Sequence, residues 1–287
     1  MTEWTIQALL DWTKKYFATK GIETPRQESE ILLAHALGCP RIELYTRFDE
    51  VVGEGPRSRF RELVRRRAEG CPVAYLVGYR EFYKLPFRVS PAVLIPRPET
   101  EHLVELALRL AANYSQPRVL DLCTGSGCIA VSVAYYCKSA QVVATDVSAD
   151  AVEVARTNAA QHGVAQRIEF RTGDLFSPIQ PDERFDLILS NPPYVAHEDL
   201  PQLHRQIRDY EPRLALDGGA GGLTFYQRIA QQVSDFLAPG ARLLLEIGYD
   251  QEEAVTALLA AVPGLSVEET VRDLARLPRV VVARRVA

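Results

Sequence analysis

The sequence contains no pattern that indicates a metal site, a disulfide framework or a membrane anchor. Its five cysteines form neither a CxxC pair nor a Cys/His spacing typical of zinc sites, which favours reduced thiols and no bound metal. No apolar run reaches the length of a membrane span, and charged residues interrupt the N-terminal segment where a signal peptide would have its apolar core. We therefore expect a cytoplasmic protein with no membrane partner.

An excess of positive charge is also absent. The 287 residues include 33 Lys and Arg against 37 Asp and Glu, a net charge of −4, and 47% of them are apolar. This balance is typical of a folded globular chain and argues against a protein whose main activity is coating nucleic acid, although it does not exclude a local basic face. The five histidines show no catalytic-triad or metal spacing.

The spacing of apolar residues predicts a small helical domain over residues 1–75. Apolar side chains recur at helical spacing from Ile6 to Phe17, and Thr24-Pro25-Arg26-Gln27 is typical of a capping box at the start of a second helix. A third helix is expected over Pro56–Ala68, where six arginines surround an apolar stripe. Those arginines fit a solvated helix face, and they also fit a docking surface for an acidic or nucleic-acid-bearing partner.

Beyond this domain, the pattern predicts a β-hairpin linker over residues 76–98 and an α/β domain over residues 99–287. Strands and helices alternate from Arg118 onward, which predicts a mostly parallel, seven-stranded sheet with helices on both faces. The expected strands are Arg118–Leu122, Gln141–Thr145, Arg167–Arg171, Phe185–Ser190, Arg242–Ile247, Ser266–Thr270 and Val280–Ala283. A long irregular connection follows Pro192, and such connections usually carry function.

The segment Asp121–Gly127 follows the first of these strands and opens a helix, which predicts a loop that binds a nucleoside. Its glycines let the backbone approach a ligand at the carboxyl end of the strand. Asp146 ends the next strand, where its carboxylate can accept hydrogen bonds from both hydroxyls of a ribose. The expected cofactor contacts in the loop are Asp121, Cys123, Thr124, Gly125, Ser126 and Gly127.

The charge of Asp121 decides between cofactors. A carboxylate beside the ligand tolerates a cation but repels a pyrophosphate. S-adenosylmethionine (SAM) carries a sulfonium and an amino group and no phosphate, so it fits this loop better than a dinucleotide. Just past the third strand, Asp174 is placed to accept the exocyclic amine of adenine and Leu175 to pack on its ring, although Asp174 also fits a turn cap.

The tetrad Asn191-Pro192-Pro193-Tyr194 ends the fourth strand with a stiff polar turn. Two prolines fix two φ angles and remove two backbone donors, so Asn191 Oδ1 and the Pro192 carbonyl can accept the two N–H bonds of a planar NH₂ group. Tyr194 is expected to pack against the face of that group, with Pro193 beside it. Asn191 is expected to contact the cofactor as well. This arrangement predicts methyl transfer to a planar nitrogen.

Several segments resemble those of the release-factor glutamine N5-methyltransferases, the PrmC/HemK family of class I SAM-dependent methyltransferases. They are Tyr79-Arg-Glu-Phe82, Ile95-Pro-Arg-Pro-Glu-Thr100, Ser190-Asn-Pro-Pro-Tyr194 and Glu211-Pro-Arg-Leu-Ala-Leu-Asp-Gly-Gly219. The likeness covers nearly the whole chain and implies a Rossmann-like methyltransferase domain. It also implies that the substrate is the glutamine of the GGQ loop in peptide chain release factors, recognised with help from the N-terminal domain.

The resemblance further places Arg97 and Glu99 near the active site, although a structural ion pair explains them equally well. Glu246 ends a predicted strand, where it fits a group that faces the cofactor cleft and also fits an acid on the surface or behind the site. The family usually has a glycine-bearing turn near the C-terminus, which Asp273–Arg279 lacks, so the geometry of that turn is open. We expect a monomer that has no direct nucleic-acid substrate.

Three other functions fit parts of the sequence. An adenine-N6 DNA or RNA methyltransferase uses the same tetrad, but the acidic balance and the lack of an added nucleic-acid-binding domain count against it. An NAD-dependent oxidoreductase fits the GxGxxA match at Gly125–Ala130 and Asp146, but it leaves the tetrad unexplained. A non-catalytic protein that kept the fold would not need both the loop and the tetrad intact.

Overall fold

The computed structural model describes residues 3–286, which form two compact units. The first unit comprises residues up to Tyr79 together with His204–Tyr210, and the second comprises Arg80–Leu203 and the residues from Glu211 onward. This division differs from the boundaries expected at residues 75 and 98. The hairpin belongs largely to the second unit because Phe82 and Phe87 are buried in the core of that unit.

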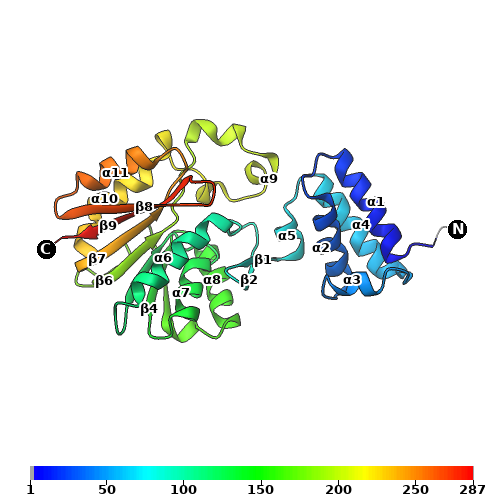
Figure 1. Cartoon of the computed structure of the whole chain (residues 1–287), viewed down its shortest axis with the longest axis horizontal. Coiled ribbons are helices and arrows are strands. Elements are labelled where there is room, and N and C mark those ends of the chain that lie inside the picture. The colour runs from blue at the N-terminus through cyan, green and yellow to red at the C-terminus, as the bar shows by residue number, and fades with distance from the viewer. Residues whose placement is uncertain (1–2, 287) are drawn as a thin grey trace. The chain divides into compact units, whose positions relative to one another are not determined.

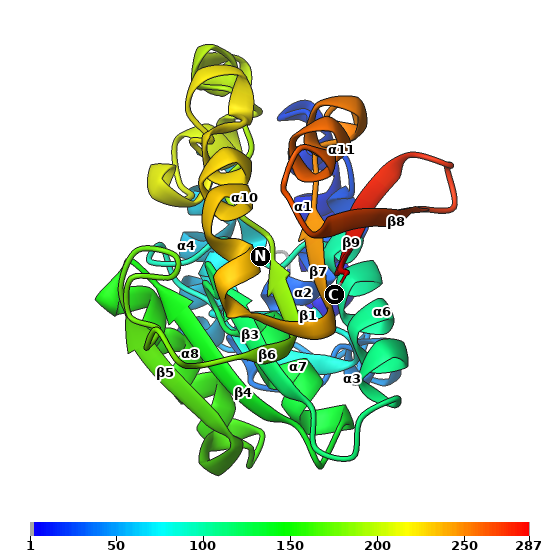
Figure 2. The same cartoon turned by 90° about the vertical axis from the view of Figure 1, so that its left-hand side faces the viewer.

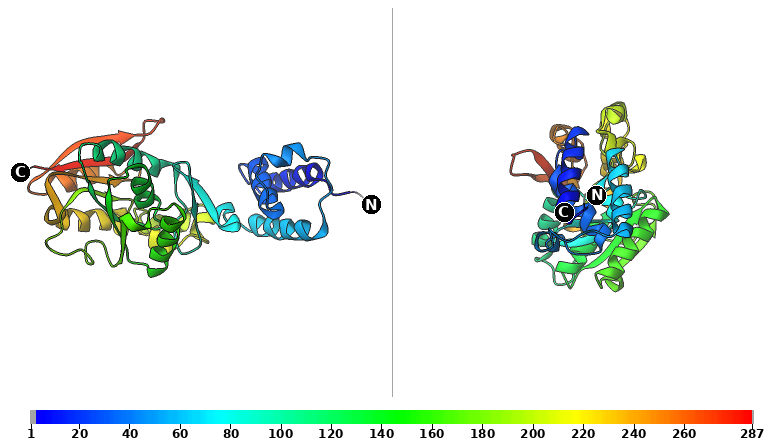
Figure 3. Two further views of the ribbon diagram at one scale, coloured as in Figure 1. Left: turned by 90° about the horizontal axis from the view of Figure 1, so that it is seen from below. Right: turned by 90° about the vertical axis from the view of Figure 1, so that its right-hand side faces the viewer.

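The first unit is a helical domain in which one helix contacts two neighbours. Its helices are α1 (Ile6–Thr19), α2 (Pro25–Leu37), α3 (Glu43–Thr46), α4 (Glu54–Ala68) and α5 (Val73–Val77). Helix α2 packs against both α1 and α4, which are drawn in blue to cyan in Figure 3. Phe17, Leu32 and Phe60 are buried where these helices meet, as expected from their helical spacing.

The capping box predicted at the start of α2 is wrong. Pro25 begins the helix, but the Thr24 side chain makes no capping bond to the backbone and instead donates to the Glu28 carboxylate at 3.4 Å. Gly38 ends the helix in the left-handed conformation with φ 69°. Proline therefore defines the start of α2 without a side-chain cap, since its fixed φ already suits the first helical position.

The arginines of α4 are largely engaged within the helical domain. Arg67 is buried and pairs with Glu28 at 2.5 Å, and Arg65 bridges Glu62 and Glu69 on the helix surface. Exposed pairs of this kind contribute little to the free energy of unfolding, whereas the buried Arg67 pair ties α4 to α2.

The second unit contains a seven-stranded sheet with the strand order β5-β4-β3-β6-β7-β9-β8 (Figure 1). The strands are β3 (Arg118–Leu122), β4 (Gln141–Asp146), β5 (Ile168–Thr172), β6 (Phe185–Ser190), β7 (Leu237–Glu246), β8 (Leu265–Arg272) and β9 (Pro278–Arg285). All pairings from β5 to β7 are parallel, and β9 runs antiparallel to both of its neighbours. The predicted mostly parallel sheet is confirmed.

Helices cover both faces of this sheet because successive strand residues point to opposite sides. The helices are α6 (Glu101–Ala111), α7 (Cys128–Tyr136), α8 (Ala149–Gln161), α9 (Arg205–Arg208), α10 (Thr224–Phe236) and α11 (Glu252–Ala260), of which α9 lies in the segment grouped with the helical domain. Helices α6, α7 and α8 share one core with Leu187 and Leu189, and α10 and α11 share the other with Ile188 (Figure 2). Among residues 3–286, no helix has both the length and the apolar character needed to cross a membrane.

The hairpin of β1 (Tyr79–Phe82) and β2 (Leu85–Arg88) is held by a side chain that the sequence pattern did not single out. Asn158 in α8 accepts a hydrogen bond from the Arg88 amide at 2.7 Å, and its Nδ2 donates to the Arg88 and Ser126 carbonyls at 3.0 and 2.8 Å. A buried amide with all of these partners connects the hairpin to the predicted cofactor loop.

The turn between β8 and β9 adopts a left-handed conformation without the expected glycine. Arg276 has φ 64°, a conformation that a non-glycine residue adopts at a cost of roughly 1 kcal/mol. Asp273 stabilises the turn, because its carboxylate accepts from the Leu277 amide at 3.0 Å and from Arg279 Nε at 2.8 Å. Asp273 therefore offsets the missing glycine.

Candidate active site

The candidate site lies at the carboxyl ends of the central strands, where the strand order reverses. From β3 the chain continues to β4 and β5 on one side, and β6 lies on the other side of β3. Open parallel sheets bind ligands at such a switch point, because the loops after adjacent strands separate there. The loops after β3, β4, β5 and β6 all contribute to one cavity.

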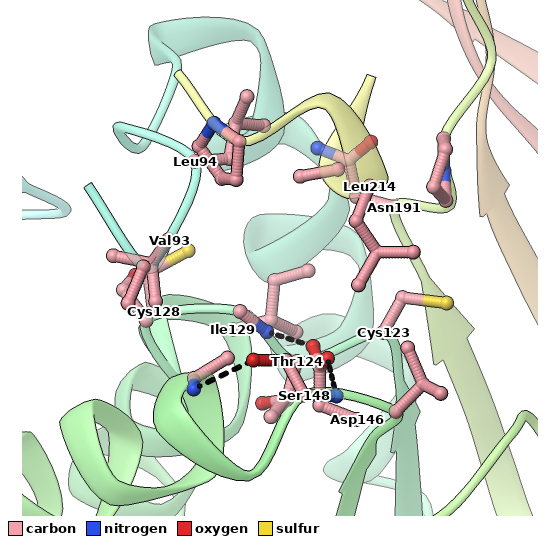
Figure 4. A pocket seen from close by; sticks show the side chains of 18 of the residues that line it. Val93, Leu94, Cys123, Thr124, Cys128, Ile129, Asp146, Ser148, Asn191 and Leu214 are labelled. Atoms are coloured by element: carbon pink, nitrogen blue, oxygen red, sulfur yellow. Dashed lines mark hydrogen bonds between the residues drawn. The ribbon is translucent and has the colours of Figure 1, made fainter. Parts of the chain in front are cut away.

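Figure 4 shows this cavity with Asn191 and Leu214 toward one end, Asp146 and Ser148 toward the other, and Cys123 between them. Of the residues predicted from sequence, those that line it are Arg97, Cys123, Thr124, Gly125, Ser126, Asp146, Asp174, Leu175, Asn191 and Pro193. The structure thus brings together residues from five separate segments of the chain.

Asp146 is held in place by the loop that it faces. One carboxylate oxygen accepts from the Gly125 amide and the other from the Ser148 amide, both at 2.9 Å, as the dashed lines of Figure 4 show. Burial raises the pKa of Asp146, and the hydrogen bonds from these amides oppose that shift. Each oxygen keeps a second lone pair, so the carboxylate can still accept from two ligand hydroxyls.

Asp121 does not lie in the cavity, which corrects the predicted contact with the ligand. It is fully buried beneath the loop, where Oδ2 accepts from the Thr124 hydroxyl at 2.6 Å and from the Ala130 amide at 3.2 Å. Ala130 lies in the first turn of α7, so the carboxylate occupies a backbone donor that could otherwise bind a phosphate. Burial raises the pKa of Asp121 to about 7.

Two residues other than glycine adopt left-handed backbone conformations in the cavity wall. Cys123 has φ 59° and Leu175 has φ 49°, and both line the cavity. Such conformations are uncommon outside glycine and concentrate at ligand-binding loops. Gly127, by contrast, does not line the cavity; a Cβ there would lie 2.9 Å from Ala155 Cβ, so its absence lets α7 approach α8.

The loop after β5 forms the other end of the predicted nucleoside site. Asp174 pairs with Arg228 at 2.6 Å, which occupies one of its oxygens, and its backbone amide donates to Ser177. Leu175 is buried, and Phe225 beside it lines the cavity with Arg228 stacked over its ring at 5.6 Å. An apolar wall next to a carboxylate suits an adenine ring with an exocyclic amine.

Asn191 presents a fixed amide at the end of β6. Its Nδ2 donates to the Thr100 hydroxyl at 3.1 Å, and Thr100 is buried in the segment before α6. Among residues 3–286, the Pro192 carbonyl accepts no hydrogen bond from a backbone amide outside the helices and strands. In the same residues, Asn191 Oδ1 makes no hydrogen bond to a side chain. The Asn191 oxygen therefore remains free at the cavity wall, whereas Pro192 is buried behind that wall.

Five predicted site residues lie elsewhere than in the cavity wall. Neither Pro192 nor Tyr194 lines the cavity; Tyr194 packs against the core on the α10 face, and its carbonyl accepts from Gln251 at 2.9 Å. Glu99 is also outside the wall, at 4.0 Å from Arg279, as are Asp121 beneath the loop and Gly127 against α8.

Arg97 forms an ion pair that joins two segments of the family resemblance. Its guanidinium contacts the Glu211 carboxylate at 2.5 Å, and the other Glu211 oxygen accepts from the Ile95 amide at 3.1 Å. Glu211 is almost completely buried, so the pair fixes the segment after the hairpin against the long connection that follows the tetrad. Arg97 thus both lines the cavity and forms an ion pair, and its partner is Glu211 rather than Glu99.

The residues present fit SAM better than a dinucleotide. The charged residues that line the cavity in the described part of the chain are Asp146, Asp174 and Arg97, and Arg97 is already paired. The Asp146 and Asp174 carboxylates would therefore repel a pyrophosphate. The Asp121 carboxylate already accepts from the Ala130 amide in the first turn of α7. Asp146 can hold the ribose, and Leu175 with Phe225 can hold the adenine.

Sequence reasoning missed several residues of the wall. Val147 and Ser148 directly follow Asp146, and Val93 and Leu94 directly precede the segment Ile95–Thr100. Because they are adjacent to predicted site residues in the sequence, these four could have been predicted as part of the wall. Phe225 and Leu214 are also part of the wall. They come from the long connection and the start of α10, where no local pattern indicates which side chains return to the site.

Comparisons with known proteins show the family and the fold of this chain. Residues 8–78 match the family described as PrmC N-terminal domain, and residues 101–220 match the family described as methyltransferase small domain. Among solved structures, the hMettl16 catalytic domain has a TM-score of 0.56 at 18% identity, covering 79% of this chain and 82% of that chain. A methyltransferase from Pyrococcus furiosus has a TM-score of 0.51 at 17% identity, covering 72% and 91%. These two likenesses show the fold.

Curated relatives are more similar and span nearly the whole chain. The release factor glutamine methyltransferase of Rhodopirellula baltica is 47% identical over 86% of this chain and 84% of its own. That of Geobacter sulfurreducens is 46% identical over 90% and 89%, and that of Koribacter versatilis is 40% identical over 98% and 99%. With a SAM-type cavity that ends in an Asn-Pro-Pro-Tyr turn, and with this extent of identity, the chain belongs to the release factor glutamine methyltransferase family.

Proposed function

We propose that this enzyme transfers the methyl group of SAM, the cofactor of its family, to the side-chain amide nitrogen of the glutamine in the GGQ loop of peptide chain release factors. The observation that carries the proposal is the Asn191 amide, which lines the same cavity as Asp146 and has its nitrogen fixed on Thr100. The names of the relatives at 40–47% identity support the substrate. The adenine alternative gains no support from any of these relatives.

The reaction requires accurate positioning of the acceptor nitrogen more than it requires a strong general base. An amide nitrogen is a poor nucleophile because its lone pair is delocalised, so the nitrogen must be held in line with the methyl group. SAM, when bound, supplies an electrophilic methyl on a sulfonium with a neutral thioether as the leaving group. Asn191 Oδ1 and the Pro192 carbonyl accept the two N–H bonds, and they stabilise the positive charge that develops on nitrogen. One of the two protons leaves to solvent once the N–C bond has formed.

Further roles follow from the same proposal. Asp146 binds the ribose, Asp174 and Leu175 bind the adenine, and residues 123–126 contact the rest of the cofactor; Asp121 and Gly127 support the loop from beneath. Pro193 and Tyr194 shape the turn, and Arg97 positions its segment through Glu211. The helical domain recognises the release factor, which its match to the PrmC N-terminal domain supports. We propose a monomer that acts in the cytoplasm on protein and not on nucleic acid.

The test is methyl transfer from labelled SAM to a purified release factor. We expect label on the native factor and none on a factor whose GGQ glutamine is replaced by alanine. Equal labelling of the two factors would contradict the proposed acceptor, and label entering DNA or RNA in parallel reactions would favour the adenine alternative.

A further inference from the structure

Side chains from distant parts of the chain hold the Asn-Pro-Pro-Tyr tetrad at both of its ends. At the first residue, Asn191 Nδ2 donates to the Thr100 hydroxyl at 3.1 Å. At the last residue, the Tyr194 carbonyl accepts from Gln251 Nε2 at 2.9 Å. The two residues between them are prolines with fixed φ angles, so a displacement of one end of the tetrad also moves the other end.

The partners of Gln251 fix the orientation of its side-chain amide. Nε2 also lies 3.4 Å from the Gly222 carbonyl, whereas Oε1 accepts from the Gly248 amide at 2.9 Å and lies 3.3 Å from the Tyr226 hydroxyl. A backbone carbonyl can only accept and a backbone amide can only donate, so the nitrogen end must face the tetrad and the oxygen end must face Gly248.

Glycines leave the space that this side chain occupies. A Cβ on Gly222 would lie 2.6 Å from Gln251 Nε2, and a Cβ on Gly248 would lie 2.8 Å from Gln251 Oε1. A Cβ on Gly218 would lie 2.8 Å from the Tyr194 Cα. The glycine-rich end of the long connection therefore packs directly on the backbone of Tyr194, and Gln251 joins the two segments.

Two simpler roles do not fit Gln251. It directly precedes α11, but its side chain makes no capping bond to that helix. It does not line the cavity either, so it is not a ligand-binding residue. Both bonds of its nitrogen go to the tetrad and to the connection that follows the tetrad, which links Gln251 to the element that carries Asn191.

We propose that Gln251 is a positioning residue, which holds the Tyr194 carbonyl and thereby sets where the Asn191 amide meets the acceptor nitrogen. This inference rests on the proposed function, because it concerns the same methyl transfer. Asn191 Oδ1 must reach a substrate N–H while the nitrogen stays in line with the methyl group. A shift of about 1 Å in such an arrangement lowers the rate roughly 100-fold.

The first test is Gln251→Met, which removes the donor and keeps an unbranched side chain of similar length. We expect kcat to fall roughly 10–100-fold. The Kd for SAM should stay nearly unchanged, because the ribose and adenine contacts lie on the loops after β4 and β5. An unchanged kcat, or a fall in kcat that a matching loss of SAM affinity accompanies, would overturn the proposal.

Gln251→Glu makes the same bond depend on pH. A protonated glutamic acid can donate to the Tyr194 carbonyl as glutamine does, whereas the carboxylate can only accept and repels both carbonyl oxygens. Partial burial against these carbonyls raises the pKa of such a carboxyl, so kcat should be close to native at about pH 6 and should fall as the pH rises toward about 8. Thus low pH should restore turnover in this variant. A Gln251→Glu profile that parallels the native profile would contradict the role of the donor.

The other titratable groups around position 251 are present in the native enzyme as well, so the native profile is the reference. Burial raises the pKa values of Tyr194 and Tyr226, which therefore stay neutral. Burial also raises the pKa of Glu246 to about 7, and the Glu246 backbone carbonyl accepts from the Tyr226 hydroxyl at 3.0 Å. The sequence neighbours are Asp250 and Glu252, and Glu252 pairs with Arg272 at 2.5 Å.

Gln232→Glu is the matched control. Gln232 is a part-buried glutamine of α10 whose Nε2 donates to the Arg228 carbonyl at 3.2 Å, which is the same kind of bond away from the tetrad. We expect native kcat and a native pH profile in this variant. A fall in kcat equal to that of Gln251→Glu would contradict the specific role of Gln251.

A second test needs no substrate, so it separates this inference from the proposed function. The chain contains three asparagines, Asn113, Asn158 and Asn191, so the side-chain NH₂ resonances of a ¹⁵N-asparagine sample can be assigned by substitution. We expect the Asn191 resonance to shift in Gln251→Met and the Asn158 resonance, fixed by two carbonyls, to stay constant. An Asn191 resonance that is the same in both enzymes would overturn the inference even if release-factor methylation is observed.

Discussion

The two loops that face each other across the cavity are built in opposite ways. The loop after β3 uses Gly125 and Gly127, which adopt left-handed conformations, and buried carboxylates hold it by accepting from its backbone and side-chain donors. The loop after β6 uses Pro192 and Pro193, which remove donors and leave oxygens as acceptors. One loop is shaped to approach a ligand with its backbone, and the other is stiffened to present a single amide.

This difference separates the roles of the two loops. In the cofactor loop, which follows β3, Asp121 accepts from the Ala130 amide and Asp146 accepts from the Gly125 amide. Changes in this loop should therefore alter the affinity for SAM. The acceptor loop carries the Asn191 amide, whose support comes from Thr100 in a distant segment, so changes there should alter turnover. Each prediction below tests whether the two sides are as separable as this geometry indicates.

Asn191→Ala should have the largest effect. The variant removes an acceptor that is held in place for the transition state, and loss of one such preorganised group lowers kcat by roughly 10²–10³-fold. The Kd for SAM, measured by isothermal titration calorimetry, should stay within a factor of about three, because the ribose and adenine contacts lie on the other loops. A large loss of SAM affinity would show that Asn191 belongs mainly to the cofactor side.

Asp146→Asn should produce the complementary result. An asparagine keeps the shape but replaces one acceptor oxygen with a donor that opposes either the Gly125 amide or the Ser148 amide. Hydrogen bonds to a charged group contribute about 1.5–3 kcal/mol each, so the Kd for SAM should rise roughly 10–100-fold. At saturating SAM, kcat should be close to that of the native enzyme. A fall in saturated kcat as large as that of Asn191→Ala would break the separation.

The glycines of the cofactor side can be tested through stability. Gly127→Ala places a Cβ at 2.9 Å from Ala155 Cβ on a backbone with φ 78°, so it should reduce the free energy of unfolding by about 1–3 kcal/mol. Gly163→Ala is the matched control, because φ there is 67° and a Cβ would meet no atom within 4 Å. The control should cost only about 1 kcal/mol from backbone strain. Equal losses in chemical denaturation would show that close packing of α7 on α8 is not what Gly127 provides.

Much of the fold and part of the site could be predicted from the sequence, for physical reasons. Strands buried on both faces read as continuous apolar runs, so Phe185–Ser190 was placed with its observed bounds. Residues adjacent to strand ends, such as Asp146 and Asn191, were placed in the cavity because parallel strands end at one edge of the sheet.

Contacts between distant segments could not be predicted. Asp121 was expected in the cavity. Its carboxylate instead accepts from the Thr124 hydroxyl and the Ala130 amide beneath the loop. The Thr100 contact with Asn191 spans 91 residues and leaves no trace in local pattern. Tyr194 lies one residue after stiff prolines, yet its ring packs on the core because an apolar surface is available there.

The smallest expected effect concerns two buried carboxyls, Asp121 in β3 and Glu246 at the end of β7. Burial raises the pKa values of both Asp121 and Glu246 to about 7, whereas unfolded Asp and Glu titrate near pH 4. Between about pH 4 and pH 7 the folded state therefore binds more protons than the unfolded state, so the free energy of unfolding falls as the pH rises and levels off above pH 7.

Replacing either carboxyl with its amide removes one of these two contributions. Asp121→Asn and Glu246→Gln should each flatten the decline of the melting temperature between about pH 4 and pH 7 by a few degrees, measured by differential scanning calorimetry. The two variants should then differ in cofactor binding, because Asp121 accepts from Thr124 and Ala130 of the cofactor loop whereas Glu246 lies at the end of β7. If Glu246→Gln raised the Kd for SAM as much as Asp121→Asn does, the two sides of the cavity would be coupled.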